Sequence, residues 1–250
     1  MNLKFLISPE FGFEYLGAWH SLNRILQQRS QLGIHLLVPR TANEYEKFIT
    51  TSRSIDLVYA NPSRTMELVR EKGYRPFARP RQHFDEMVIV SNVNSRVRKV
   101  EDLQAGCRIA CTANEDVRLI GLRLLEPANL HTHNTTWVTV DSHENATRAL
   151  IRGEVDVAFF SLDAFSSFSR LTRLQLHPIV QSVIHDIYHT LLIHPKRADK
   201  LPALQAAFWG LGQQEGDEAI LAGIGLPKGF EPLSREDAEF MIDLMDTLRD

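Results

Sequence analysis

The stretch C-T-A-N-E-D-V-R-L-I-G, from Cys111 to Gly121, places polar residues between a run typical of a buried strand and a run typical of a helix. Free backbone N–H groups and the positive end of the helix dipole meet at such a junction, which therefore favours anions. This junction instead carries Asn114, Glu115 and Asp116. The residue types and the expected local structure thus point to opposite ligand charges.

Two interpretations of these carboxylates stay open. In the first, Glu115 and Asp116 point to solvent from the first helical turn and stabilise the helix dipole by about 0.3–1 kcal/mol each. In the second, they give the site a preference for a cationic or hydroxyl-rich ligand, or for none. Arg118, one turn further into the helix, could neutralise them.

The elements that position this junction follow from hydrophobic periodicity. Strand-like and helix-like runs alternate, which predicts an α/β fold with largely parallel sheets. The expected strands are 3–7, 34–39, 55–60, 87–91, 108–111, 137–140, 155–159 and 188–193. The expected helices are 15–28, 43–50, 63–72, 117–126, 143–152, 202–213 and 234–248, the last with Ser234 as its N-cap.

The chain is expected to cross between two lobes around residues 85–91 and 182–190. The first lobe would contain residues 1–88 and 189–250, and the second residues 89–188. Such a fold has a ligand cleft between its lobes.

Composition limits the partners. The 250 residues carry a formal net charge of −3 without a block of like charges, which favours neither nucleic acid nor an anionic membrane surface. No apolar run reaches the roughly 20 residues that span a bilayer. The first residues lack the apolar core and cleavage site of a secretory signal, so the expected location is cytoplasmic as written, or periplasmic if a leader has been removed.

Other candidate chemistry is weak. Cys107 and Cys111 lie about 13 Å apart along one expected strand, too far for a disulfide, and are expected to be free buried thiols. The histidines, including His131 and His133, do not form a convincing zinc motif, and we expect no metal and no cofactor. Arg75, Arg79 and Arg81 are expected in a solvated loop, Phe159 and Phe160 in the core of the second lobe. No phosphate-binding loop, dinucleotide fingerprint or nucleophile elbow is present.

Three stretches occur in the order and spacing of one known family: D-L-V-Y-A-N-P-S (56–63), V-R-K-V-E-D-L-Q-A-G-C-R-I-A (97–110) and V-D-S-H-E-N-A-T-R-A-L-I-R-G-E-V-D-V-A (140–158). From residue 3 to about residue 215 the chain resembles the phosphate, phosphite and phosphonate receptors of ABC transporters. The S-H…G-E-V-D block is the most specific part, whereas E-D-L-Q-A-G is shared more widely. The resemblance implies a two-lobed type II periplasmic-binding-protein-like fold that closes around its ligand by a hinge.

The resemblance also implies a set of ligand contacts. Ser63 would act as N-cap and donor after Asn61-Pro62, His143 would correspond to the histidine of the family's Ser-His pair, and Asp163 would meet an ammonium group or cap a helix. The family's hydroxyl-rich loop is replaced here by Asn114 to Val117. The full set is Asn61, Ser63, Thr112, Asn114, Glu115, Asp116, Ser142, His143 and Asp163.

The leading hypothesis is a non-enzymatic receptor for a phosphonate-like, phosphate-like or changed small molecule, working with an ABC permease or as a sensor for a signalling protein. One alternative is a cytosolic enzyme of the same fold acting on a small carboxylate, with Glu115, Asp116 and His143 as acid–base groups. A third is an interaction domain with a degenerate cleft.

Overall fold

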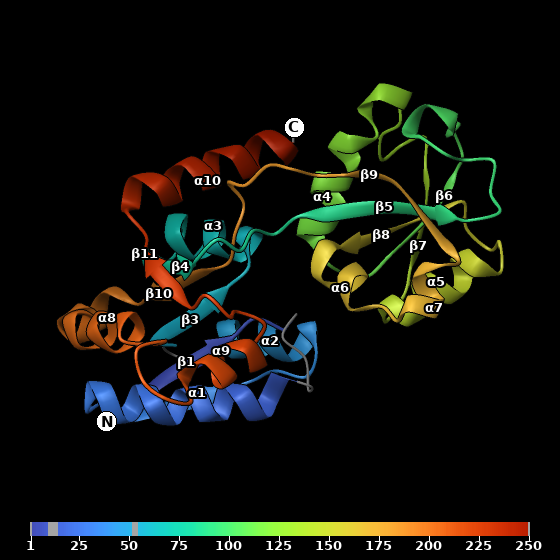
Figure 1. Cartoon of the computed structure of the whole chain (residues 1–250). Helices are drawn as coiled ribbons and strands as arrows, with labels where there is room; N and C mark the ends of the chain where they lie inside the picture. The colour runs from blue at the N-terminus through green and yellow to red at the C-terminus, as the bar shows by residue number, and fades with distance from the viewer. Residues whose placement is uncertain (1, 10–14, 52–54, 250) are drawn as a thin grey trace. The chain divides into compact units, whose positions relative to one another are not determined.

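The computed structural model describes residues 2–9, 15–51 and 55–249. The chain divides into two compact units: unit 1 contains Met1–Phe84 and Tyr188–Met245, and unit 2 contains Asp85–Ile187 and Asp246–Asp250 (Figure 1). The chain passes from unit 1 to unit 2 between residues 84 and 85 and returns between residues 187 and 188. The sequence-based division places these boundaries after residues 88 and 188. The last five residues are grouped with unit 2. The assignment of the two lobes by sequence remains a proposal.

Unit 1 is built on a six-stranded mixed sheet with the order β11-β4-β10-β3-β1-β2. Strands β1, β2 and β3 are parallel, whereas β10 and β11 run antiparallel to their neighbours. The elements of this unit are β1 (Leu3–Ile7), α1 (Leu16–Ser30), β2 (Ile34–Leu37), α2 (Ala42–Thr51), β3 (Leu57–Ala60), α3 (Pro62–Arg70), β4 (Arg75–Pro80), β10 (Thr190–Ile193), the 3-10 helix η4 (Pro195–Lys200), α8 (Leu201–Trp209), α9 (Asp217–Gly223), β11 (Phe230–Pro232) and α10 (Arg235–Arg249), whose last residues belong to unit 2.

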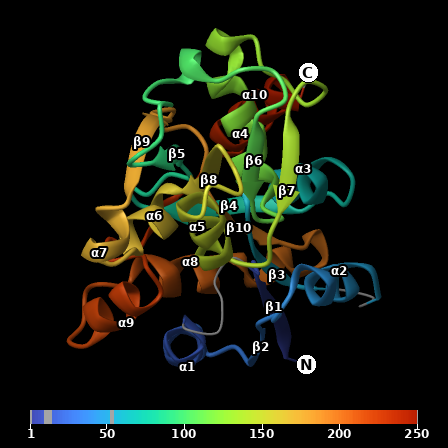
Figure 2. The ribbon, with the colours of Figure 1, turned by 90° about the vertical axis from the view of Figure 1, so that its right-hand side faces the viewer.

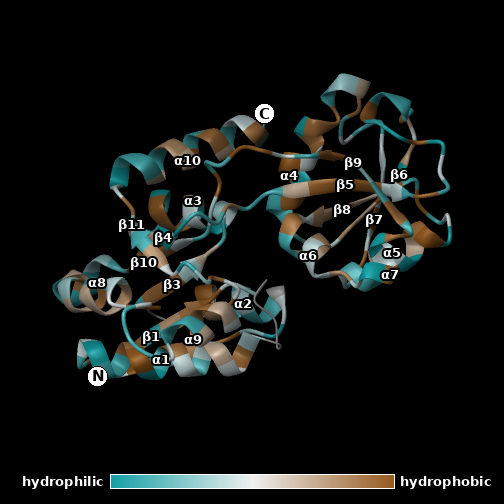
Figure 3. Cartoon of the chain, in the orientation of Figure 1, coloured by the Kyte–Doolittle hydropathy of each residue, from teal (hydrophilic) through white to brown (hydrophobic). Residues whose placement is uncertain are grey.

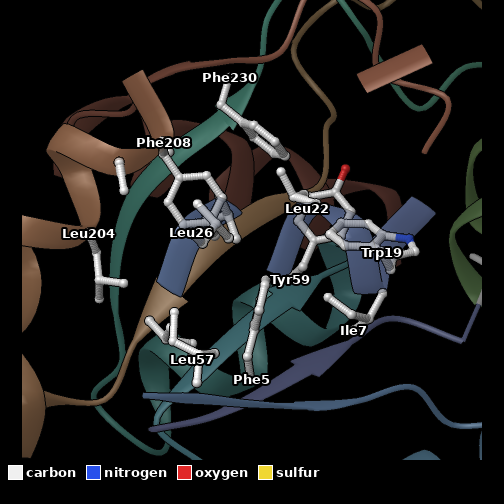
Figure 4. Packing of buried hydrophobic residues seen from close by; sticks show 14 of the residues in the cluster. Phe5, Ile7, Trp19, Leu22, Leu26, Leu57, Tyr59, Leu204, Phe208 and Phe230 are labelled. Carbon is white, nitrogen blue, oxygen red and sulfur yellow. The ribbon is translucent and has the colours of Figure 1, made fainter. Parts of the chain in front are cut away.

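The main core of unit 1 lies between this sheet and helices α1, α8 and α9. Figure 4 shows Trp19 and Phe208 packed beside Phe5 and Tyr59, and every one of these side chains is at most 1% exposed. The rings meet mostly edge to face, as between Phe5 and Trp19 at 6.2 Å. Alternate strand residues such as Leu6 and Val58 form a second cluster with helices α2 and α3 on the other face.

Unit 2 is built on a five-stranded mixed sheet with the order β7-β6-β8-β5-β9. Strand β6 is parallel to β7 and β8, and β5 is antiparallel to β8 and β9. Its elements are β5 (Met87–Asn92), the 3-10 helix η2 (Val100–Asp102), β6 (Arg108–Cys111), α4 (Glu115–Leu124), the 3-10 helix η3 (Glu126–Ala128), β7 (Thr136–Thr139), α5 (His143–Ile151), β8 (Val157–Ser161), α6 (Leu162–Ser167), α7 (Arg170–Arg173) and β9 (Leu176–Gln181).

Helices cover both faces of this sheet, and its central strands are correspondingly apolar (Figure 3). On one face Phe160 packs with Ala146 and Leu150 of α5. On the other, Gly121 of α4 sits so close to Phe159 that an added Cβ would lie 2.2 Å from the ring. Both phenylalanines are fully buried, which confirms their predicted place in the core.

The sequence predicted most elements but not the sheet pattern. The expectation of largely parallel sheets is wrong, because β5, β10 and β11 each run antiparallel to their neighbours. The expected solvated loop around Arg75 to Arg81 is also wrong: residues 75–80 form β4, paired with β10 and β11. Cys107 and Cys111 are buried free thiols, as predicted. None of the helices in the described part of the chain is long and apolar enough to cross a membrane.

Candidate functional site

The carboxyl ends of β6, β7 and β8 form one edge of the unit 2 sheet, because the three strands run in the same direction (Figure 2). Cys111 at the end of β6 is opposite Thr139 of β7, and the Val140 amide donates to the Cys111 carbonyl at 3.0 Å. Each strand leads into a helix, with Asn114, Ser142 and Ser161 as N-caps. The unit therefore brings three helix starts to one edge, and these starts hold seven of the nine predicted contact residues.

At the start of α4, the Asn114 side chain accepts a hydrogen bond from the Val117 amide at 3.1 Å. Glu115 is exposed and pairs with Arg249 at 3.0 Å. Asp116, in contrast, is only 4% exposed, so the expectation that both carboxylates point to solvent is wrong for Asp116. The helix turns successive side chains by about 100°, which puts Asp116 on the face that contains buried Val117 and Ile120. The half-buried Thr112 lies in the preceding loop.

At the start of α5, the Ser142 hydroxyl accepts a hydrogen bond from the Asn145 amide at 3.2 Å. His143 follows, half-buried, with its ring centroid 5.9 Å from that of Phe160. Its Nδ1 is buried and has no hydrogen-bond partner among the described residues. Burial lowers the pKa of His143 below its ordinary 6.5, more than Glu144 raises it, so the ring is neutral at pH 7. A neutral imidazole can donate one hydrogen bond and accept another.

Asp163 lies in the first turn of α6, where it is exposed. The cap of this helix is Ser161, whose hydroxyl accepts from the Ala164 amide at 3.3 Å. The interpretation of Asp163 as the capping residue is therefore wrong. Its expected contact with a ligand ammonium remains a prediction.

Asn61 and Ser63 belong to unit 1. Asn61 caps α3 by accepting from the Arg64 amide at 3.0 Å, and the helix begins at Pro62. Ser63, inside the first turn and 5% exposed, is therefore not the N-cap that the sequence suggested. Since these two residues and the other seven lie in different units, a single site formed by all nine stays a prediction.

From the sequence, the expected role of Arg118 is to neutralise the charges of Glu115 and Asp116. The structure shows no ion pair from Arg118 to any acidic side chain of the described residues; its guanidinium instead lies over the Trp137 ring, 4.3 Å from the centroid. The sequence carries no signal of this pairing, because Trp137 is 19 positions away in another element. Among the described residues, no group of three or more metal-binding side chains is present.

Comparison with known proteins identifies the relatives of this chain. Residues 11–238 match the family model of the periplasmic substrate-binding protein of phosphonate ABC transporters. The chain belongs to this family. A comparison with curated proteins gave no match.

Solved structures with the same fold agree. A binding-protein component of an ABC phosphonate transporter from Pseudomonas aeruginosa has a TM-score of 0.75 at 16% identity, with 99% of this chain and 88% of that one covered. PhnD1 from Prochlorococcus marinus, in complex with methylphosphonate, has a TM-score of 0.79 at 14% identity, with 99% of this chain and 98% of that one covered. The aliphatic sulphonate-binding protein SsuA from Escherichia coli has a TM-score of 0.67 at 17% identity, with 99% of this chain and 87% of that one covered. These similarities show the two-lobed periplasmic-binding-protein fold.

The family also confirms the leading functional hypothesis. As a member of the periplasmic substrate-binding proteins of phosphonate ABC transporters, this chain is a solute-binding receptor of an ABC importer. Its relatives in the family and among the solved structures are binding proteins.

Proposed function

We propose that the solute of this receptor is a small phosphonate-class oxyanion held at the carboxyl end of β7, where α5 begins. Ser142 and the backbone amides of the first turn of α5 would face one side of the oxyanion, and the neutral His143 would donate a ring N–H to it. The observation that carries the proposal is the buried Nδ1 of His143, which has no partner among the described residues. Helix N-termini stabilise negative charge, so a dianionic group suits this place.

The start of α4 is a poorer place for the same group. Asp116 is buried there, and a buried carboxylate beside a phosphonate costs several kcal/mol in repulsion and desolvation. We therefore assign the phosphoryl oxygens to Ser142 and His143, and give Thr112, Asn114, Glu115 and Asp116 a role in shaping the site. Asn61 and Ser63 of unit 1 and Asp163 of α6 complete the proposed set, the last as partner of an ammonium group.

The proposal includes the fate of the solute. The receptor would bind it without chemical change and deliver it to an ABC permease, and its location would be periplasmic, as is typical of the family. A chemical change of the solute at the same site is the competing assignment. Recovery of a bound phosphonate with an unchanged phosphorus NMR spectrum supports binding alone, and a new product resonance would support an enzyme.

The test is calorimetric titration with methylphosphonate, 2-aminoethylphosphonate and inorganic phosphate, with small carboxylates and polyamines as the contrasting classes. A thermal-shift screen comes first, because a ligand at 100 times its Kd stabilises a protein by about 2.7 kcal/mol. We expect His143→Ala to weaken phosphonate binding tenfold or more, and His131→Ala, an exposed histidine, to leave it unchanged. Tight binding of carboxylates or polyamines with none of the phosphorus oxyanions would refute the proposal.

A further inference from the structure

The guanidinium of Arg118 is the starting point. It lies 4.3 Å from the centroid of the Trp137 ring and makes no hydrogen bond and no ion pair with the described residues. Arg123, on the same helix, is fully engaged: it pairs with Glu126 at 2.8 Å and donates to the Thr247 carbonyl. Arg118 is also half-buried, so it has exchanged part of its hydration for a stack on an indole.

The Trp137 indole beside it also lacks a hydrogen-bond partner among the described residues. The Nε1 of Trp137 is buried and has no acceptor among the described residues, while the ring meets Phe159 edge to face at 5.5 Å. Indole N–H and guanidinium N–H groups only donate hydrogen bonds. Because the Trp137 Nε1 is buried, the half-buried Arg118 guanidinium is the donor of the two that stays open to an anionic acceptor.

The acidic residues of α4 do not fill this place. Glu115 is paired with Arg249, and Asp116 is buried without an ion pair to Arg118. Stacking on the indole fixes the plane of the guanidinium and leaves the N–H groups at the edge of this plane available. Two of these N–H groups can donate parallel hydrogen bonds to one carboxylate or phosphoryl group.

Arg118 lies near the edge of the sheet that holds the proposed solute. Side chains of a helix lean toward its N-terminus, which for α4 is the carboxyl end of β6. The charge of Arg118 reaches Cys111, the last residue of β6: burial raises the pKa of this thiol to about 12, and Arg118 acts to lower it.

Arg118 and His143 lie toward opposite faces of that edge. Trp137, under Arg118, packs on Phe159, whereas His143 packs on Phe160. Consecutive residues of a strand point to opposite faces of the sheet. We therefore expect that one phosphoryl group does not contact both side chains, and that a contact with Arg118 requires a second anionic group on the solute.

We propose that Arg118, stacked on Trp137, binds a second anionic group of the solute, so that this receptor selects phosphonates or organophosphates that also carry a carboxylate or a second oxyanion. The inference rests on the proposed function, which supplies the first anionic group at Ser142 and His143.

The test measures affinities by calorimetry for probes that differ in one charged group: ethylphosphonate and propylphosphonate against phosphonoacetate, 3-phosphonopropionate and 4-phosphonobutyrate. The wild-type chain should bind at least one carboxylated probe about tenfold more tightly than the alkyl probes, since a charge-assisted pair is among the stronger polar contacts. Arg118→Gln should abolish this preference while leaving alkylphosphonate affinity unchanged. Arg118→Lys keeps the positive charge but cannot donate two parallel hydrogen bonds, so it should retain part of the preference for carboxylated probes. Arg123→Gln is the matched control on the same helix and should behave as wild type.

The outcomes separate the two proposals. If no phosphonate binds the wild-type chain, both the proposed function and this inference are wrong. If alkylphosphonates bind but the carboxylated probes gain nothing, or if Arg118→Gln keeps the preference, only the inference is overturned. Loss of thermal stability in Arg118→Gln and Arg118→Lys with the preference intact would show that Arg118 only packs on Trp137.

Discussion

The carboxylate of Glu86 is bound to Ser182, 96 positions further along the chain. Glu86 is 8% exposed and accepts a hydrogen bond from the Ser182 hydroxyl and from the amides of Ile184 at 2.7 Å and His185 at 2.8 Å. A backbone bond from Asp85 to the Ile187 carbonyl at 2.8 Å runs beside it. The segment that enters unit 2 and the segment that leaves it are thereby tied together.

Removal of this acceptor should loosen the departing segment. In Glu86→Ala the part-buried Ile184 and His185 amides and the buried Ser182 hydroxyl lose this acceptor, and a buried donor left unsatisfied costs about 1–3 kcal/mol. We expect hydrogen exchange to quicken at these two amides and the free energy of unfolding to fall by about that amount. Glu101→Ala, an exposed carboxylate of the same unit, is the control. Unchanged exchange at residues 184 and 185 would show that the Glu86 contacts do not hold the segment.

Gly121 should tolerate no side chain. A Cβ there would lie 2.2 and 2.5 Å from two atoms of the Phe159 ring and 2.9 Å from the Met87 methyl group. Gly121→Ala should therefore destabilise the chain by about 1–3 kcal/mol through overpacking, measured by denaturant unfolding. Gly17 in α1 is the matched control: nothing lies within 4 Å of its added Cβ, so Gly17→Ala should be neutral or stabilising. Phe159→Leu should recover part of the loss in Gly121→Ala, and equal stability of the two alanine variants would contradict the packing.

Acidification should act through His143. Because burial lowers its pKa below 6.5, the unfolded chain takes up a proton at this position before the folded protein does. The stability contributed by the neutral ring is complete above about pH 6.5 and is lost as the pH falls from there to the lowered pKa. We expect the Tm of the wild-type chain to fall more steeply than that of His143→Gln between pH 7.5 and 5. Parallel curves for the two proteins would exclude a buried neutral ring.

Asp217 and Arg29 form a buried ion pair in unit 1 at 2.8 Å. Burial acts to raise the pKa of Asp217, which is 1% exposed, but hydrogen bonds from Arg29 and from the Gln214 and Gly212 amides hold it below its ordinary 3.8. Its contribution to stability is therefore present above about pH 3.8 and is lost as the pH falls through the lowered pKa.

Breaking this pair should be costly. Asp217→Asn leaves the Arg29 charge uncompensated and should lower the free energy of unfolding by about 3 kcal/mol. Glu239→Gln, which breaks the exposed Arg235–Glu239 pair on α10, should cost less than about 1 kcal/mol. Similar losses in the two variants, measured by urea unfolding, would mean that Asp217 behaves as a surface charge.

Local patterns predicted the elements that carry most of the proposed site. Strands 3–7 and 108–111 match the structure residue for residue, and the helix predicted from residue 143 begins there. Ser234 caps α10 as expected, since its hydroxyl accepts from the Asp237 amide at 3.0 Å. Such features depend on neighbouring residues only, and alternation, capping and apolar spacing express them directly.

The prediction of a loop at β4 failed because this strand depends on distant residues. Its sequence R-P-F-A-R-P contains two prolines, which lack the N–H that a sheet interior uses, and locally it favours a loop. It is a strand because β10 and β11, more than 100 positions later, pair with it on both sides. The same late strands make the unit 1 sheet mixed, and in unit 2 the first strand, β5, does so by pairing antiparallel with β8 and β9.

The sequence by itself determined the family, the alternation of strands and helices, and the helix that begins at His143. Only the tertiary structure decided that Glu115 is exposed and paired with Arg249 while Asp116 is buried, and that Arg118 lies on Trp137. The physical reason is that a residue's type fixes its charge and its local conformational preference. Its burial and its partners depend on side chains that come from distant parts of the chain.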